Sequence, residues 1–212
     1  MKHPGWVIRR QGLVDYLAAW QAMRDFTVAR NAQTPDELWL LQHPPVYTLG
    51  LAGKAEHLLR ATEIPVVKTD RGGQITYHAP GQVILYLLID LQRRGCGVKA
   101  LVHGMEQSVI DLLAEYGVAG VRREKAPGVY VNGAKIAALG LKVKSGGCYH
   151  GLALNADMDL VPFAAINPCG YAGMRVTQTR DQGVAEGVEV LGEKLLQHLV
   201  NNLERMTKSS RN

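Results

Sequence analysis

Residues 83–89 form an unbroken apolar run that directly follows a glycine-rich segment. An apolar run of this length is typical of a buried strand. The preceding segment, residues 71–82, contains three glycines, one arginine and one histidine. Glycines let a backbone approach a ligand without interference from a Cβ atom, and charged and titratable side chains lie in the same place. Together the two segments predict a buried strand that follows a ligand-binding loop.

The rest of the chain predicts a single α+β domain, with mostly antiparallel mixed sheets that carry helices on one side. Asn132-Gly133 between two apolar runs is a strong short-range signal of a β-hairpin. We expect residues 162–177 to form an ordered loop, and residues 207–212 to form a flexible tail after a domain spanning 1–206. The expected helices cover residues 13–31, 101–116 and 189–206. The expected strands cover 37–41, 46–49, 64–68, 82–91, 138–143 and 149–155, and the expected hairpin covers 129–136.

Composition narrows the class of protein. The 212 residues are 47% apolar and 20% charged, which is enough for one domain with a sizeable core. The net charge of +5 comes from scattered residues, which argues against nucleic-acid binding and is compatible with an acidic protein partner. Three cysteines without a CxxC pair indicate a reducing compartment. Without a secretory signal or a run of about 18 apolar residues, we expect a cytoplasmic protein that does not bind membranes.

Cys169 is a candidate nucleophile because it lies between Pro168 and Gly170. A thiol with a pKa near 8.5 is mostly protonated at neutral pH, so a working nucleophile needs activation. Two interpretations stay open here: an activated nucleophile, or a small buried hydrophobic residue, which is the usual fate of a free cysteine. For the first, we expect peptide N–H groups beside Gly170 and one from the glycine-rich loop to hold an oxyanion.

Lys135 follows the predicted hairpin turn inside an otherwise apolar run, residues 134–141. It is either an exposed lysine on an edge strand or an inward-facing group. An ammonium about 4 Å from a thiolate is worth about 4 kcal/mol at an effective dielectric near 20. Only about 2 kcal/mol is needed to bring a thiol pKa from about 8.5 to about 7. An inward Lys135 close to Cys169 therefore favours the thiolate, although the cost of desolvating the ammonium offsets part of the attraction.

Three histidines are further candidates for site residues. A lone histidine is more often structural, but His78 and His150 stand among glycines, where ligands approach closely. We assign His78 a binding or orienting role and leave proton transfer to Lys135. His43, before Pro44, is expected only to cap a turn. Neither metal-ligand spacing nor a GxxxxGK[ST] or GxGxxG motif occurs, so we expect neither a metal nor ATP.

Several motifs occur in a fixed order between about residue 38 and residue 173. They are Asp70-Arg71-Gly72-Gly73-Gln74, Thr76-Tyr77-His78, Pro80-Gly81-Gln82, Ala126-Pro127-Gly128-Val129-Tyr130-Val131, Lys135-Ile136, Leu139-Gly140-Leu141, His150-Gly151-Leu152-Ala153-Leu154-Asn155 and Asn167-Pro168-Cys169-Gly170. In this combination the chain resembles the lipoyl(octanoyl) transferase family. The resemblance implies the fold of the catalytic domains of biotin- and lipoate-protein ligases.

The resemblance also implies an activity that needs no cofactor. An octanoyl group would pass from octanoyl-acyl carrier protein to a specific lysine of lipoyl domains, in 2-oxoacid dehydrogenase complexes and in the glycine cleavage H protein. In the family's pattern Cys169 forms the acyl thioester and Lys135 lowers its pKa. The implied acyl pocket is lined by Arg71, Gly72, Gly73, Gln74, Ile75, Thr76, Tyr77, His78, Ala138, Leu139, Gly140, Gly151, Leu152 and Ala153. Some family members carry a hydroxyl residue in place of Ala138, so we expect only a backbone contact there. Leu139, Leu152 and Val129 are the expected apolar walls.

Two other kinds of protein are also compatible with the sequence. A ligase of the same fold would adenylate lipoate or biotin, and would need ATP, magnesium and a phosphate loop but not Cys169. A non-catalytic module would bind an acyl chain or a lipoyl domain without turnover. Transfer from octanoyl carrier protein without ATP, abolished by Cys169→Ser, distinguishes the transferase from both.

Overall fold

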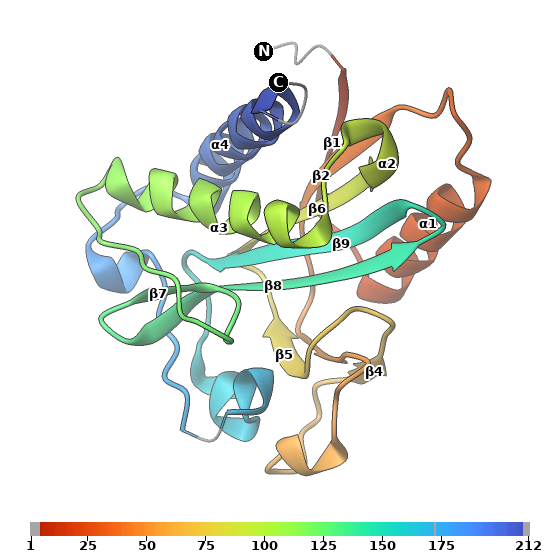
Figure 1. Ribbon diagram of the computed structural model, residues 1–212. Helices are drawn as coiled ribbons and strands as arrows, with labels where there is room; N and C mark the ends of the chain where they lie inside the picture. The colour runs from red at the N-terminus through yellow and green to blue at the C-terminus, as the bar shows by residue number, and fades with distance from the viewer. Residues whose placement is uncertain (1–4, 172, 210–212) are drawn as a thin grey trace.

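Two sheets form the framework of the molecule (Figure 1). A computed structural model describes residues 5–171 and 173–209, with the side chains of Cys169 and of residues 207–209 outside the description. The larger sheet has the order β1 (Trp6–Leu13), β2 (Asp36–Gln42), β6 (Gln82–Asp90), β9 (Gly147–Asn155), β8 (Ala134–Lys144) and β7 (Val129–Val131). The smaller sheet has the order β4 (Val66–Lys68), β3 (Val46–Leu49) and β5 (Ile75–His78).

Most strand pairs are antiparallel, as the sequence predicted. Only β1 with β2 and β3 with β4 pair in parallel among the named strands of the described chain. The α+β class with mixed sheets is therefore confirmed.

Helices cover both faces of the larger sheet. They are α1 (Tyr16–Ala29), α2 (Leu91–Arg94), α3 (Val98–Ala114) and α4 (Val188–Ser209). Val83, Leu85 and Leu87 of β6 pack with α3 and α4, while the alternating residues Ile84 and Leu88 pack with α1. The prediction of helices on one side was wrong. The covering of both faces explains why every residue from 82 to 89 is buried.

Local chemistry sets several boundaries. Helix α1 begins at the N-cap Asp15, whose side chain accepts from the amide of Ala18 at 3.0 Å, so it is shorter than predicted. Leu13 and Leu17, which lie within the range predicted for this helix, are 60% and 51% exposed. Strand β1 was not predicted, because Arg9 and Arg10 on this edge strand interrupt the apolar alternation.

The hairpin between β7 and β8 forms where the sequence predicted it. Asn132 and Gly133 have φ values of 47° and 81°, the left-handed pair of a two-residue turn. Part of the glycine-rich segment is a strand, β5, which the sequence had not separated from the loop. Helix α4 runs three residues beyond its predicted end and takes in the start of the expected tail, and residues 210–212 lie outside the described residues.

The 3₁₀ helix η4 (Arg180–Gln182) precedes α4 in the chain. The 3₁₀ helices η1 (Ala55–His57), η2 (Val161–Ala165) and η3 (Pro168–Gly170) shape the loops beside the smaller sheet. Tyr47, Tyr77, Phe163 and Ile166 form a separate apolar cluster there, which orders the segment predicted as a loop. Within the described part of the chain, no helix combines the length and the apolar character needed to cross a membrane.

Candidate active site

The largest group of predicted site residues surrounds one cavity of about 510 Å³, which we call the main cavity. It is lined by Tyr16, Arg71, Gly73, Gln74, Ile75, Thr76, His78, Ile84, Tyr86, Ala138, Leu139, Gly140, His150, Gly151, Leu152 and Ala153. All the predicted pocket residues are among them except Gly72 and Tyr77. The amide of Gly72 donates to Leu141 O at 2.9 Å, and Tyr77 packs edge-on against Phe163 in the cluster of the smaller sheet.

Two of the three expected apolar walls are in place. Leu139 and Leu152 line the main cavity, where they are paired across β8 and β9. Val129 is fully buried in the core under α3 and does not line it. That expectation was wrong because β7 is an edge strand whose Val129 packs with the helices.

Arg71 is a buried guanidinium that ties the glycine-rich segment to β3. Its Nε and Nη2 atoms donate to Thr48 Oγ1 at 3.1 and 2.8 Å, and Nη2 also donates to Thr48 O at 2.5 Å. A Cβ built on Gly140 would lie 3.2 Å from Arg71 Cδ, so the two sides of the cavity meet closely here. Arg71 therefore fixes the loop at a set distance from β8.

A cluster of neutral aromatic and imidazole rings lies at one end of the main cavity. His43 is fully buried; its Nδ1 donates to Val14 O and its Nε2 accepts from the Tyr86 hydroxyl, both at 2.7 Å. The expectation that His43 only caps a turn was wrong. His78 donates from Nδ1 to Gln82 Oε1 at 2.7 Å. Burial lowers the pKa of His43 to about 4 and that of His78 to about 3, so both rings are neutral at pH 7.

Asp70 joins this end of the cavity to α1 and β9. Its carboxylate accepts from Trp20 Nε1 at 2.8 Å, from His150 Nε2 at 3.1 Å and from the Tyr149 hydroxyl. Burial raises the pKa of Asp70, but these hydrogen bonds outweigh it and leave the pKa well below its usual range. His150 has φ of 65°, a left-handed conformation that is costly for a residue other than glycine. The conformation lets the adjacent residues Tyr149 and His150 both reach Asp70.

Lys135 faces inward and not toward solvent. Its side chain is buried, and Nζ donates to Pro127 O at 3.0 Å and lies 5.3 Å from the centre of the Tyr130 ring. Gly128 leaves room for it: a Cβ at Gly128 would lie 2.9 Å from Lys135 Cε. Of the two interpretations of Lys135, the exposed edge-strand lysine is therefore wrong.

Lys135 and Pro168 line a second cavity of about 280 Å³, the inner cavity. Thr76 and Ala138 belong to the walls of both cavities, so the inner cavity adjoins the main cavity. The structure describes the main chain of Cys169, directly after Pro168, and not its side chain. The segments that carry the two predicted catalytic residues thus meet at one cavity.

The turn around Cys169 is packed against the glycine-rich segment and against η1. A Cβ built on Gly170 would lie 3.0 Å from Gln74 Cγ and 3.3 Å from His57 Nε2. The amide of Asn167 donates to His57 O at 2.9 Å. The amides of Gly170 and Tyr171, which were expected to hold an oxyanion, donate to Asn167 O and Pro168 O within the turn. In this conformation both donors are occupied.

A chain of side-chain amides links the two cavities. Gln82 accepts from His78 and donates from Nε2 to Asn155 Oδ1 at 2.8 Å, and Asn155 Nδ2 donates to Thr177 O at 2.9 Å. Thr177 in turn donates from its amide to Lys135 O at 3.0 Å. This network fixes the strand that carries Lys135 relative to the ring cluster.

Several residues that line the cavities were not predicted from the sequence: Tyr16, Ile84, Tyr86, Gln82, Asn155 and Phe163. Gln82 and Asn155 lie within the motifs quoted above and could have been found there. Tyr16 and Tyr86 gave no local signal, because they come together only when α1 packs on β6. Within the described residues, no group of three or more histidine, cysteine or carboxylate side chains is placed to hold a metal ion.

Comparisons with known proteins show which family the chain belongs to. The family model of the lipoyl protein ligase A/B catalytic domain matches residues 15–200. An octanoyltransferase of Nitrosomonas europaea is 62% identical over 196 residues, which is 92% of this chain and 96% of the relative. An octanoyltransferase of Thiobacillus denitrificans is 65% identical over 186 residues, 88% of this chain and 85% of the relative.

Solved structures with low sequence identity share the fold. A lipoate-protein ligase A bound with ATP matches with a TM-score of 0.75 at 13% identity, over 97% of this chain and 91% of that one. A biotin protein ligase from Aquifex aeolicus matches with a TM-score of 0.59 at 11% identity, over 97% and 72%. The fold expected from the motifs is thus confirmed. The chain belongs to the lipoyl protein ligase A/B catalytic-domain family.

Proposed function

We propose that this chain is an octanoyltransferase that carries an octanoyl group from octanoyl-acyl carrier protein, through a thioester on Cys169, to a lysine of lipoyl domains. The observation that supports it most directly is the inner cavity. Buried Lys135 and Pro168, the residue before Cys169, line that cavity, which adjoins the main cavity at Thr76 and Ala138. The high identity to octanoyltransferases over most of the chain supports the same activity.

The first half-reaction exchanges one thioester for another. The Cys169 thiolate attacks the carbonyl carbon of the donor, the bond from that carbon to the carrier sulfur breaks, and the carrier leaves as a thiol after taking up a proton. Because bonds of the same kind are formed and broken, this step is nearly isoenergetic and needs no ATP. A nearby ammonium on Lys135 stabilises the thiolate that starts the reaction.

The second half-reaction forms an amide. The acceptor lysine, with an ordinary pKa of about 10.4, is almost fully protonated at pH 7 and must lose a proton before it attacks. We assign that proton to Lys135, which can act as a base once it is neutral. The amine then displaces the Cys169 thiolate, which regains the starting state. The contact with Pro127 O and the space left by Gly128 hold the Lys135 side chain for both roles.

The main cavity suits the acyl chain. An octanoyl chain has seven C–C bonds, which at about 1.2 Å per bond along an extended chain span roughly 8 Å. The cavity follows β8 from Ala138 to Gly140 and ends at His150, which is paired with Leu141. Three strand residues correspond to roughly 10 Å. The chain thus fits between the inner cavity and the ring cluster.

The acceptors we propose are the lipoyl domains of 2-oxoacid dehydrogenase complexes and the glycine cleavage H protein. A thiol nucleophile must stay reduced, so we place the enzyme in the cytoplasm. We assign the catalytic domain to residues 1–206, with no cofactor.

Intact mass spectrometry tests the proposal. Wild type incubated with octanoyl-acyl carrier protein and no ATP should gain one octanoyl group, which a lipoyl domain then removes. Cys169→Ser should neither form this adduct nor transfer the group. Cys148→Ser is the matched control, because burial raises the pKa of the Cys148 thiol to about 12 and keeps it protonated.

Three results would contradict the proposal. Transfer without an acyl-enzyme adduct would show that no thioester on Cys169 is an intermediate. Transfer only with lipoate and ATP would indicate the ligase chemistry of the structural neighbours. Binding of octanoyl carrier protein that is unaffected by Cys169→Ser and leads to no turnover would indicate a non-catalytic module.

A further inference from the structure

Two arginine side chains converge at the Asn132-Gly133 turn, outside both cavities. Arg123 Nη2 donates to Gly133 O and Arg175 Nη2 donates to Asn132 O, each at 2.9 Å. Both nitrogens lie 3.3 Å from the position that a Cβ would take on Gly133. They are therefore at most twice that distance from each other. Both residues are exposed, so two positive charges stand side by side at the surface.

Neither arginine has a carboxylate partner within residues 5–171 and 173–209. The neighbouring Arg122 differs, because it forms an ion pair with Glu106 at 3.1 Å and belongs to the structural contacts of α3. A guanidinium has five N–H donors, and a single carbonyl occupies only part of that set. The free donors and the mutual repulsion of Arg123 and Arg175 both favour an anion bound between them.

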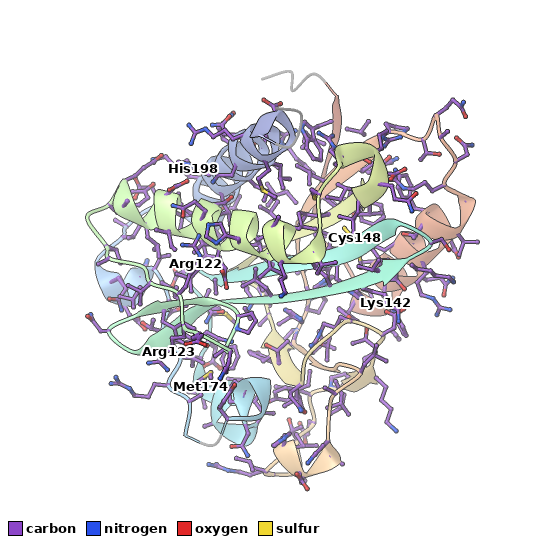
Figure 2. The ribbon with its side chains drawn as sticks, in the orientation of Figure 1. Arg122, Arg123, Lys142, Cys148, Met174 and His198 are labelled. Atoms are coloured by element: carbon purple, nitrogen blue, oxygen red, sulfur yellow. The ribbon has the colours of Figure 1, made fainter. Side chains whose placement is uncertain are left out.

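The pair opens onto a surface cavity of about 760 Å³, also lined by Tyr171, Gly173 and Met174. Figure 2 shows Arg123 and Met174 close together near the β7 end of the hairpin. Tyr171 is two residues after Cys169, and its hydroxyl donates to Lys125 O at 3.2 Å. This cavity thus begins at the turn that carries Cys169.

The arginine pair is also adjacent to Lys135 through the main chain. The amide of Lys135 donates to Arg175 O at 2.8 Å, and Lys135 is bridged to Val176, which lines the inner cavity. Gly133 precedes Lys135 by two strand residues, roughly 7 Å. The two arginines therefore lie close to Lys135, which belongs to the proposed reaction centre.

We propose that Arg123 and Arg175 bind the phosphate of the phosphopantetheine arm on which an acyl carrier protein presents its thioester. The inference rests on the proposed function, since it assigns the donor's phosphate to a site beside the same reaction centre. About twelve bonds separate the phosphate oxygen from the sulfur in such an arm, roughly 14 Å when extended. That length exceeds the roughly 7 Å of chain between Gly133 and Lys135, so an arm held at the arginine pair is long enough to reach the inner cavity.

Two small donors that differ only in the phosphate test this site: octanoyl-phosphopantetheine and octanoyl-pantetheine. The rate of acylation of Cys169 is measured by intact mass for both. Wild type should prefer the phosphorylated donor by about tenfold or more in kcat/KM, the usual effect of a charged hydrogen-bonded pair. Arg175→Ala should remove most of that preference and leave the rate with octanoyl-pantetheine within about twofold.

Lys142→Ala is the charge-matched control, because Figure 2 places Lys142 near the opposite end of the β8–β9 hairpin from Arg123. It should leave the preference for phosphate unchanged. Arg123→Ala is the second variant. The Arg123 side chain also stacks on Tyr130, 4.4 Å from the ring centre, so its removal can destabilise the fold. If Arg123→Ala is unstable, the result for Arg175→Ala decides the test.

A ratio of kcat/KM near one for the two donors in the wild type would refute the phosphate site, as would an equal loss of rate with both donors in Arg175→Ala. If Lys142→Ala lowered the ratio as much as Arg175→Ala, the preference would come from the overall positive charge and not from a site. Failure of wild type to react with either small donor or with octanoyl-acyl carrier protein would instead refute the proposed function.

Discussion

Mild acid should destabilise this protein through two buried histidines. His43 and His78 lie in the ring cluster with ring centres 5.8 Å apart, and burial keeps both neutral. Their folded pKa values, about 4 and about 3, are below the value near 6.5 expected for the unfolded chain. Below about pH 6.5 the unfolded state therefore binds more protons. Stability that is present above that pH is lost as the pH falls toward the folded values.

The size of the effect follows from the same values. Between about pH 7.5 and about pH 5.5, protonation of each histidine stabilises the unfolded state by about 1.4 kcal/mol, the free energy that corresponds to one pKa unit. The folded groups stay neutral over this range, so the pair should cost about 3 kcal/mol of unfolding free energy. His150, whose pKa burial also lowers, adds in the same direction.

Urea denaturation followed by circular dichroism at several pH values measures this loss. His43→Asn and His78→Asn should each lower the overall stability but remove about 1.4 kcal/mol of its pH dependence. The double variant should remove both contributions and leave the part that comes from His150. His103→Asn, on the exposed side of α3, is the matched control and should change neither. A wild-type stability that is flat over this range, or a control that reduces the slope as much, would refute the argument.

Three other predictions concern the site. Lys135→Ala should slow iodoacetamide labelling of Cys169 at neutral pH by about tenfold or more, whereas Lys135→Arg should keep labelling within about threefold and lose amide formation by about 10² or more; unchanged labelling in the alanine variant removes Lys135 from the mechanism. Ala153→Leu, which fills the main cavity, should lower kcat/KM for octanoyl donors by about 10² and spare butanoyl donors; equal losses for both chain lengths would place the acyl chain elsewhere. Asp70→Asn should lower the free energy of unfolding by about 2 kcal/mol in urea titrations, because it weakens three hydrogen bonds at once; a change below about 0.5 kcal/mol would mean that this network contributes little to stability.

Local signals in the sequence were sufficient for much of the fold. The Asn132-Gly133 hairpin depends on two adjacent residues that both adopt left-handed conformations, so it could be predicted. The run at β6 is apolar throughout because both of its faces are covered. Strand β1 could not be predicted, since Arg9 binds Glu37 and Arg10 binds Glu193 on a sheet edge, and these polar residues conceal the strand.

The parts of the site that come from one continuous segment could be predicted from the sequence. The parts that form from separate segments of the chain could not. The glycine-rich segment and the 138–140 and 151–153 segments were predicted, and most of them line the main cavity. The ring cluster joins Tyr16 of α1, His43 of the turn after β2, His78 of β5 and Tyr86 of β6, which come together only in the folded chain. The direction of Lys135 depends on the space left by Gly128, which only the folded chain reveals.

The position of β6 has a consequence for how substrate enters. Buried on both faces and paired on both edges, β6 should be among the slowest elements to exchange its amide hydrogens. It supplies Ile84 and Tyr86 to one wall of the main cavity, whereas the facing wall includes residues of the smaller sheet and of the loop before it. We therefore expect the motions that admit an acyl chain to be movements of the smaller sheet, while β6 stays in place.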